Sequence, residues 1–269
     1  MKLAYMYATP DVVHSEVTAI QGDVDFCFEL IKQTGYTGVE LLLANPKEVS
    51  VPTIAQAAAN SGLDIPALCT GEVYGQDGLS FADPDPKKRQ QAIDRMKYAM
   101  DIGGYFNAPV NVGRLRGRYQ KNIEKEQTLD WIRQALIQCA EEFPEVPIVM
   151  EPVNHLYANC LITTDDMLRF VLALNHPRIG MMLDMAHILI EEENLPESVE
   201  KVHKHGLLWH FHLSDSDRLP MGDGKYKIKP VINALHENHY DRYVTVETFQ
   251  IPDSDYAIKR SFEVLEPYF

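Results

Sequence analysis

Short apolar runs alternate with amphipathic stretches from one end of the chain to the other. A run that is apolar on both faces is typical of a strand that is buried on both sides of a sheet. This pattern predicts eight strands, near residues 2–8, 38–43, 64–69, 109–113, 147–152, 179–184, 207–213 and 243–248.

Helices are predicted in the intervals between these strands, because apolar residues recur there at helical spacing. Thr163 or Thr164, followed by two aspartates, is typical of a helix N-cap with acids in the first turn. The predicted helices lie near residues 23–34, 51–61, 86–102, 124–142, 164–175, 196–205, 229–238 and 254–267.

Alternating strands and helices predict right-handed βαβ units and a parallel sheet. Eight units favour an α/β fold of the closed (β/α)8 type, a TIM barrel, with residues 1–269 as a single barrel domain. The first strand is not followed by a Gly-rich turn, since residues 8–12 read Ala-Thr-Pro-Asp-Val. This absence argues against a dinucleotide-binding open sheet.

Composition and charge are those of an ordinary globular protein with an acidic balance. Hydrophobic residues make up 45% of the chain and the formal net charge is −14. That charge opposes binding to nucleic acid, which needs clustered Lys and Arg. Four cysteines without C-x-x-C spacing suit reduced, buried thiols. With no leader segment and no apolar run long enough for a bilayer, we expect a cytoplasmic protein that does not bind membranes.

Four successive strands end in a residue that can bind a metal. The runs are Ile148-Val-Met-Glu151, Gly180-Met-Met-Leu-Asp184, Leu208-Trp-His-Phe-His212 and Tyr243-Val-Thr-Val-Glu247, with ligands 33, 28 and 35 residues apart. Each step is about one βα unit, so the four side chains are expected on neighbouring strands 5 to 8. Three carboxylates and one imidazole suit a divalent cation, with Mn²⁺ favoured and Co²⁺, Mg²⁺ or Zn²⁺ as alternatives.

These runs and their flanking motifs closely resemble the xylose-isomerase-like barrel superfamily of sugar isomerases and epimerases. Within it, the chain is most similar to the ketose 3-epimerases. The matching motifs are Glu151-Pro-Val-Asn154, Leu183-Asp-Met-Ala-His187, His210-Phe-His-Leu-Ser-Asp-Ser-Asp-Arg218, Gly222-Asp-Gly224 and Val246-Glu247.

The resemblance implies a set of roles for these positions. One divalent metal ion would be held by Glu151, Asp184, His212 and Glu247. His187 and Arg218 would contact oxygen atoms of the substrate, which would be a ketose or a ketose phosphate.

His210 and His212 compete for the histidine position among the ligands. Both side chains lie on one face of the predicted strand because of its two-residue period, so both are expected to face the barrel interior. His212 is preferred, because it lies nearer the carboxyl end of the strand and Arg218 follows it at the family's spacing. His210 is then expected to be a hydrogen-bonded interior residue or a partner of the ligand.

The implied reaction is epimerisation at a carbon next to the ketone, through a cis-enediolate. Glu151 and Glu247 would act as base and acid from opposite sides of the sugar, while Asp184 and His212 would only bind the metal. The alternative is an aldose–ketose or hydroxypyruvate-type isomerase, for which one glutamate suffices. Two distant alternatives are an apurinic endonuclease, which needs histidines on early strands that this chain lacks, and a non-catalytic sugar-binding barrel.

Some residues outside these motifs are further candidates. Glu40 and Glu72 are expected near the barrel mouth, where each could bind a substrate hydroxyl or form a structural ion pair. A basic cluster after the fourth strand is expected to be a solvated loop or, alternatively, a phosphate-binding lid; it comprises Arg114, Arg116, Arg118 and Lys121.

The segment after Glu151 departs from the family pattern. Ketose 3-epimerases commonly carry another acid there, whereas this chain has Tyr157 near that place. The identity of the sugar and the choice between epimerase and isomerase therefore stay open, as does homo-oligomerisation.

Overall fold

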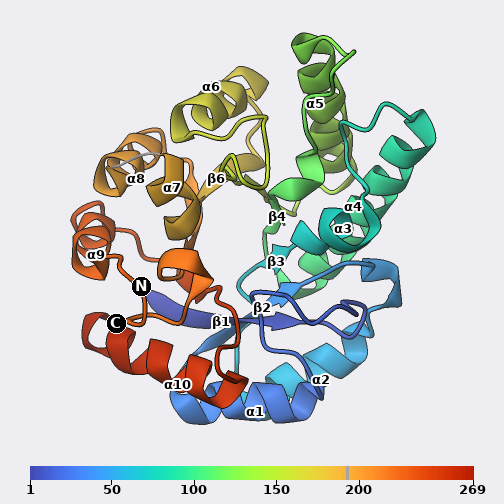
Figure 1. Ribbon diagram of the computed structural model, residues 1–269. Coiled ribbons are helices and arrows are strands. Elements are labelled where there is room, and N and C mark those ends of the chain that lie inside the picture. Colours follow the sequence, from blue (N-terminus) through green and yellow to red (C-terminus); the bar gives the residue numbers. More distant parts are fainter. Residues whose placement is uncertain (192–193) are drawn as a thin grey trace.

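Eight parallel strands pair in chain order and close into a barrel in the computed structural model, which describes residues 1–191 and 194–269 (Figure 1). The last strand pairs with the first, so the sheet has no free edge. The predicted single-domain TIM barrel is confirmed. Its strands are β1 Lys2–Ala8, β2 Gly38–Leu42, β3 Leu68–Cys69, β4 Val110–Val112, β5 Ile148–Met150, β6 Ile179–Asp184, β7 Leu208–Leu213 and β8 Tyr243–Val246.

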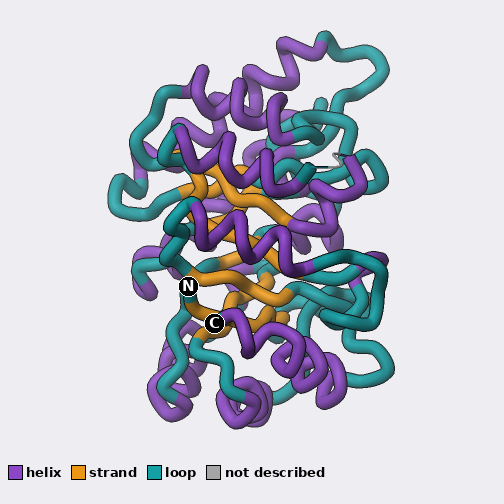
Figure 2. The backbone as a smooth tube through the Cα atoms, turned by 90° about the vertical axis from the view of Figure 1, so that its left-hand side faces the viewer, coloured by secondary structure: helices purple, strands orange, loops and turns teal. Residues whose placement is uncertain are grey.

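The helices surround the strands, and the two chain termini lie at the same end of the barrel (Figures 1 and 2). The outer helices are α1 Val24–Thr34, α2 Val51–Ser61, α4 Pro86–Phe106, α5 Lys125–Glu142, α6 Thr164–Leu174, α8 Leu195–Lys204, α9 Ile228–Glu237 and α10 Ser254–Leu265. Two short helices, α3 Gly71–Asp77 and α7 Met185–Glu191, directly follow β3 and β6 and were not predicted. Single 3-10 turns lie at Pro46–Glu48, Arg114–Arg116, Ser216–Arg218 and Glu266–Tyr268.

Several smaller predictions are confirmed. Thr163 caps α6, since its hydroxyl accepts a hydrogen bond from the backbone N–H of Asp166. All four cysteines are free thiols in buried positions. Within the described residues, none of the helices combines the length and apolar character that a bilayer crossing requires.

The third strand is shorter than predicted. Residues 64–69 were expected to form a strand, but only Leu68–Cys69 does so. Pro66 explains the difference, because proline has no backbone N–H to donate to a neighbouring strand.

Side chains alternate between the helix layer and the barrel interior, as the two-residue period of a strand requires. In β7, Phe211 and Leu213 belong to the main apolar core, whereas His210 and His212 do not. A small separate cluster of apolar side chains lies inside the barrel near β1 to β3, made of Met6, Ala8, Val12, Val17, Ala19, Leu42, Ala44 and Cys69. Beside β6 to β8 the barrel interior also holds polar and charged residues, among them Asp184, His212 and Thr245.

Arg116, in the basic segment after β4, is not solvated, whereas Lys121 in the same segment is exposed. Arg116 has no exposed surface, and its guanidinium donates to the backbone carbonyls of Gly113, Glu151, Cys160 and Leu161 at 2.5–3.2 Å. Burial lowers its pKa to about 10, so it stays protonated at neutral pH. Arg116 therefore joins the loops that follow β4 and β5.

Arg116→Met is expected to destabilise the fold, because it leaves several buried carbonyl groups without donors. The expected loss is about 3 kcal/mol or more in the free energy of unfolding. Urea denaturation measures it, with Arg118→Met, two residues away and partly exposed, as the matched control. The control should lose no more than about 0.5 kcal/mol. Equal losses in both variants would contradict the structural role of Arg116.

Candidate active site

The four predicted ligands meet at the carboxyl end of the barrel. Glu151 directly follows β5, Asp184 ends β6, His212 lies in β7 and Glu247 directly follows β8. One donor atom from each lies within 4.8 Å of the others. His212 Nδ1 is 2.9 Å from Glu247 Oε2 and 3.6 Å from Asp184 Oδ2. His212, rather than His210, thus takes the place beside the carboxylates.

Arg218 is buried among these carboxylates, rather than solvated as its position in a loop suggests. Its Nη1 donates to Asp184 Oδ2 at 2.7 Å and to Glu247 Oε2 at 3.0 Å. Arg218 is only 8% exposed. The guanidinium therefore supplies a fixed positive charge at the edge of the cluster.

The backbone that carries Arg218 is strained. Asp217 and Arg218 have φ angles of 58° and 59°, a region that L-residues rarely adopt. Asp215 holds the loop in this shape, because its carboxylate accepts hydrogen bonds from the backbone N–H groups of Ser216, Gly222 and Tyr226 at 2.7–3.0 Å.

His187 reaches the site from the first turn of α7. Asp184 Oδ1 accepts hydrogen bonds from the backbone N–H groups of Ala186 and His187, so the Asp184 carboxylate also orients the start of this helix. Arg218 Nη2 donates to His187 Nε2 at 2.9 Å. Burial, with a further contribution from Arg218, lowers the pKa of His187 to about 3, so the imidazole is neutral.

Crowding of charge perturbs the ionisable groups of the site. Burial raises the pKa of Glu151 to about 7, with His212 opposing the rise and Asp184 and Glu247 adding to it. Burial acts in the same direction on Asp184, but the guanidinium of Arg218 holds its pKa well below the usual range. The pKa of His212 lies well above its usual value despite burial, because Glu40 and the nearby carboxylates favour the imidazolium.

A pocket with a cavity volume of about 150 Å³ opens above the cluster. Five of the predicted site residues line it: Glu72, Glu151, His187, Arg218 and Glu247. Tyr157 also lines it and meets the ring of His187 edge-on at 5.9 Å. Asp184 and His212 have no exposed surface and lie beneath the pocket.

Glu40 does not lie at the mouth of the barrel. It has no exposed surface, is not among the residues that line the pocket, and is hydrogen-bonded to His210 and His212. The expectation that it contacts a substrate hydroxyl does not fit this position. Glu72 does line the pocket, where it pairs with Arg114 and with His14 Nε2.

Several residues of the site escaped the sequence analysis. Asn111 Nδ2 donates to Glu151 Oε2 at 3.1 Å, and Thr18 Oγ1 donates to Glu247 Oε1 at 2.7 Å. Asn111 could have been found, since it is a polar residue at the inward position of β4. Thr18 and His14 belong to the irregular segment after β1, whose path no periodicity predicts.

Comparison with known proteins places this geometry in a family. The model of the xylose isomerase-like TIM barrel family matches residues 28–268. The chain belongs to that family. The resemblance inferred from the motifs is thereby confirmed.

The relatives are sugar epimerases with low sequence identity to this chain. A probable ketose 3-epimerase from Synechocystis sp. is 23% identical, over 88% of this chain and 82% of the relative. The 3-dehydro-D-guloside 4-epimerase of Escherichia coli is 24% identical, over 82% of this chain and 85% of the relative. These relatives confirm the enzyme class that was expected, an isomerase that acts on sugars.

Solved structures share the fold. The D-allulose 3-epimerase from Methylomonas sp., solved in complex with D-allulose, superposes with a TM-score of 0.81 at 16% identity. The superposition covers 100% of this chain and 97% of the other.

Gly113 makes room for the Glu151 carboxylate, since a Cβ at residue 113 would lie 2.4 Å from Glu151 Oε2. Gly113→Ala is therefore expected to displace this carboxylate and to weaken Mn²⁺ binding by about tenfold or more. Isothermal titration with Mn²⁺ measures the effect. Gly104→Ala is the control, because its Cβ would meet only Val146 Cγ2, at 3.5 Å, and should leave affinity unchanged. Indistinguishable affinities in the two variants would contradict the expected displacement.

Proposed function

We propose that this protein is a metal-dependent epimerase that inverts a carbon next to the ketone of an unphosphorylated ketose, with C3 favoured. The observation that carries the proposal is the convergence of four ligands from four successive strands beneath a pocket that two of them, Glu151 and Glu247, also line. The activities named for the relatives support the choice of an epimerase and of C3.

The donor set fits a divalent cation. Three carboxylates and one imidazole are hard to borderline ligands, and their donor atoms are close enough to share one ion. The absent side chain at Gly113 leaves space for the Glu151 carboxylate beside them. Glu151, Asp184, His212 and Glu247 would hold the ion, for which Mn²⁺ is the favoured candidate. When bound, a divalent cation supplies Lewis-acid stabilisation of negative charge on oxygen.

The proton transfer is assigned to the two glutamates that line the pocket. One carboxylate takes the proton from the carbon next to the ketone, which leaves a cis-enediolate. The other glutamate starts as the carboxylic acid and gives its proton to the opposite face, so the carbon is inverted. Proton exchange with solvent then restores both glutamates, and no co-reactant is consumed. Asn111 and Thr18 each donate to one oxygen of these carboxylates, at 3.1 and 2.7 Å, and so hold them in place.

His187 and Arg218 would stabilise the charge that develops on the substrate oxygens. Both line the pocket, and they contact each other through a hydrogen bond of 2.9 Å. Arg218 is already held by Asp184 and Glu247, so its donors need no reorganisation during the reaction.

The rival functions have less support. An aldose–ketose or hydroxypyruvate-type isomerase needs one glutamate, whereas both line the pocket here. An apurinic endonuclease would need histidines on the early strands, but the described residues of β3 and β4 include Cys69 and Asn111 and no histidine. A non-catalytic barrel would not need four potential metal ligands at the ends of four successive strands, and all four are present here.

Replacing Glu151 or Glu247 by Gln keeps an oxygen ligand but removes a base. Each variant is expected to lose at least about 100-fold in epimerisation, which is the low end of a general acid–base contribution. In D₂O, each should still exchange a substrate proton from its remaining face, and the two variants should prefer opposite epimers. Mass spectrometry of the recovered ketoses measures the label, and metal content is measured alongside. A variant with full turnover and bound metal would overturn the two-base epimerase.

The charges around the pocket favour a neutral sugar over a sugar phosphate. Four carboxylates line it, from Glu16, Glu72, Glu151 and Glu247, against two guanidinium groups. Both of these are already paired, Arg114 with Glu72 and Arg218 with Asp184 and Glu247. Among the described residues that line the pocket there is no lysine. A phosphate dianion would therefore meet acids and no unpaired cation.

Free ketoses are therefore expected to react with a kcat/KM at least about 100-fold above that of their phosphorylated counterparts, which corresponds to about 2.7 kcal/mol. Glu72→Ala should narrow this gap, because it frees Arg114 to meet a phosphate. A coupled assay with matched pairs of ketose and ketose phosphate measures both ratios. A preference for the phosphate in the unmodified enzyme would contradict the neutral substrate.

A further inference from the structure

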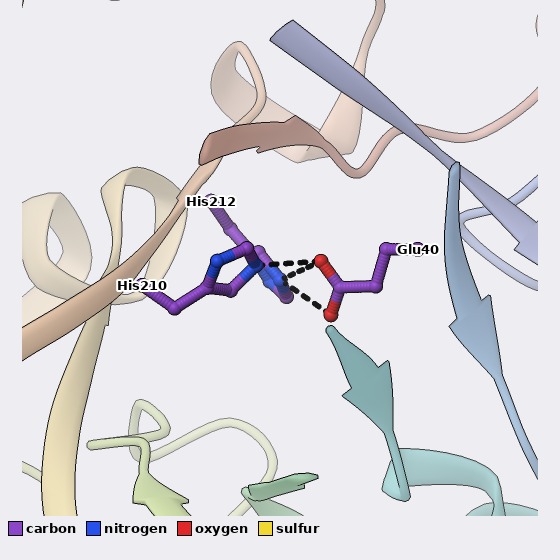
Figure 3. A group of neighbouring side chains, drawn as sticks. All are labelled: Glu40, His210 and His212. Carbon is purple, nitrogen blue, oxygen red and sulfur yellow. Dashed lines mark hydrogen bonds and ion pairs between the residues drawn. The ribbon is translucent and has the colours of Figure 1, made fainter. Parts of the chain in front are cut away.

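A second buried cluster lies directly beneath the proposed metal ligands. Figure 3 shows the imidazoles of His210 and His212 turned toward the carboxylate of Glu40, which reaches across the barrel from β2. His210 Nε2 lies 2.6 Å from Glu40 Oε2, and His212 Nε2 lies 3.0 Å from both oxygens of Glu40. The three residues are between 0% and 1% exposed.

Burial of the Glu40 carboxylate costs free energy because the charge loses its hydration. Neighbouring groups must replace the lost water contacts. A buried charge is tolerated only where donors or opposite charges replace water. The two imidazoles are the hydrogen-bond partners of Glu40 among the described residues. His210 Nε2 also lies 3.3 Å from Thr245 Oγ1. A substrate role is ruled out by position, since Glu40 does not line the pocket. Its interaction with His212 is therefore the link between Glu40 and the site.

The contact with Glu40 determines which nitrogen of His212 faces the other ligands. A carboxylate accepts hydrogen bonds, so Nε2 must carry the proton that it donates to Glu40. Nδ1 lies at hydrogen-bond distance from Glu247, where a bound cation would take the place of a proton and leave the ring neutral. Nδ1 is the atom that lies 2.9 Å from Glu247 and 3.6 Å from Asp184.

We propose that Glu40 is a positioning residue of the metal site, which fixes the tautomer and ring orientation of His212 so that Nδ1 binds the cation. The proposal rests on the metal dependence of the proposed function. His210 shares the carboxylate and helps to balance its charge in the barrel interior.

The same three residues could instead hold an ion of their own, since their donor atoms lie within 4.8 Å of one another. Access to the pocket opposes this reading. None of these three residues lines the pocket, whereas Glu151 and Glu247 do, so an ion has an entry path to the other cluster.

The test compares Mn²⁺ affinity in three full-length proteins by isothermal titration, without substrate. Glu40→Gln keeps the shape but removes the charge and turns an amide N–H₂ toward one of the two imidazole donors. We expect its dissociation constant for Mn²⁺ to rise about 10- to 100-fold, the usual effect of losing such a partner.

Asp11→Asn is the matched control, because Asp11 is another buried carboxylate but accepts from the backbone N–H groups of Ala44 and Asn45. It should lower the midpoint of thermal unfolding and leave Mn²⁺ affinity unchanged. An equal loss of affinity in both variants would show a general loss of stability and overturn the proposal.

A measurement on the unmodified protein does not depend on the folding of any variant. In the zinc-loaded protein, ¹⁵N chemical shifts of His212 should show a protonated Nε2 and a metal-bound Nδ1. Metal on Nε2, two ions per chain, or a Glu40→Gln variant with unchanged affinity would each overturn the role of Glu40.

These outcomes separate the two proposals. If the unmodified protein binds one Mn²⁺ but epimerises no ketose, the proposed function fails while the role of Glu40 in metal binding stands. If it binds no divalent cation at all, both fail.

Discussion

The accumulation of negative charge inside the barrel is the constraint on which the site depends. Glu151, Asp184 and Glu247 bring three carboxylates within a few ångströms of one another at buried or nearly buried positions. Like charges at this distance in a poorly solvated place are costly without positive charge between them. Arg218 supplies part of that charge, and a divalent cation would supply the rest. Polar and charged side chains therefore share the interior of this barrel with a small apolar cluster near β1 to β3.

The loop after β7 illustrates how the fold meets this requirement. Placing the guanidinium of Arg218 between Asp184 and Glu247 needs two successive residues in the left-handed region, which costs about 1–3 kcal/mol for each. The hydrogen bonds of Asp215 to three backbone N–H groups offset this cost. The strain in this loop thus lies in the two residues that carry the charge to the cluster.

The pocket combines a lower part built by strands with an upper part built by loops. Its lower part comes from the carboxyl ends of strands, with Leu42 in β2, Cys69 in β3, and Glu151 and Glu247 directly after β5 and β8. Its upper part comes from irregular segments, with His14 and Thr18 after β1 and Glu72 in the short helix α3. Relatives of this fold are named as 3-epimerases and as a 4-epimerase. Loops tolerate change better than strands, so the upper part is the natural place for differences in the sugar that is bound.

The sequence by itself determined the barrel and the four residues that meet at its carboxyl end. Strand and helix periods are local properties, and one ligand at the end of each of four successive strands must lie at the same end of a closed parallel sheet. The choice of His212 over His210 followed from its place along the strand. Local patterns also predicted a cap at Thr163 or Thr164, since such a hydrogen bond spans only three residues, and the structure has it at Thr163.

Only the tertiary structure decided the partners of the remaining polar residues. Glu40 and His212 are 172 residues apart, and Thr18 and Glu247 are 229 apart, so no local pattern relates them. Arg116 was expected at the surface because its loop is basic, yet it is buried where four backbone carbonyls from two loops converge. Hydrogen bonds of this kind depend on where distant segments meet in three dimensions. Which distant segments come together depends on the whole fold, so the residues on either side of a position do not reveal its partners.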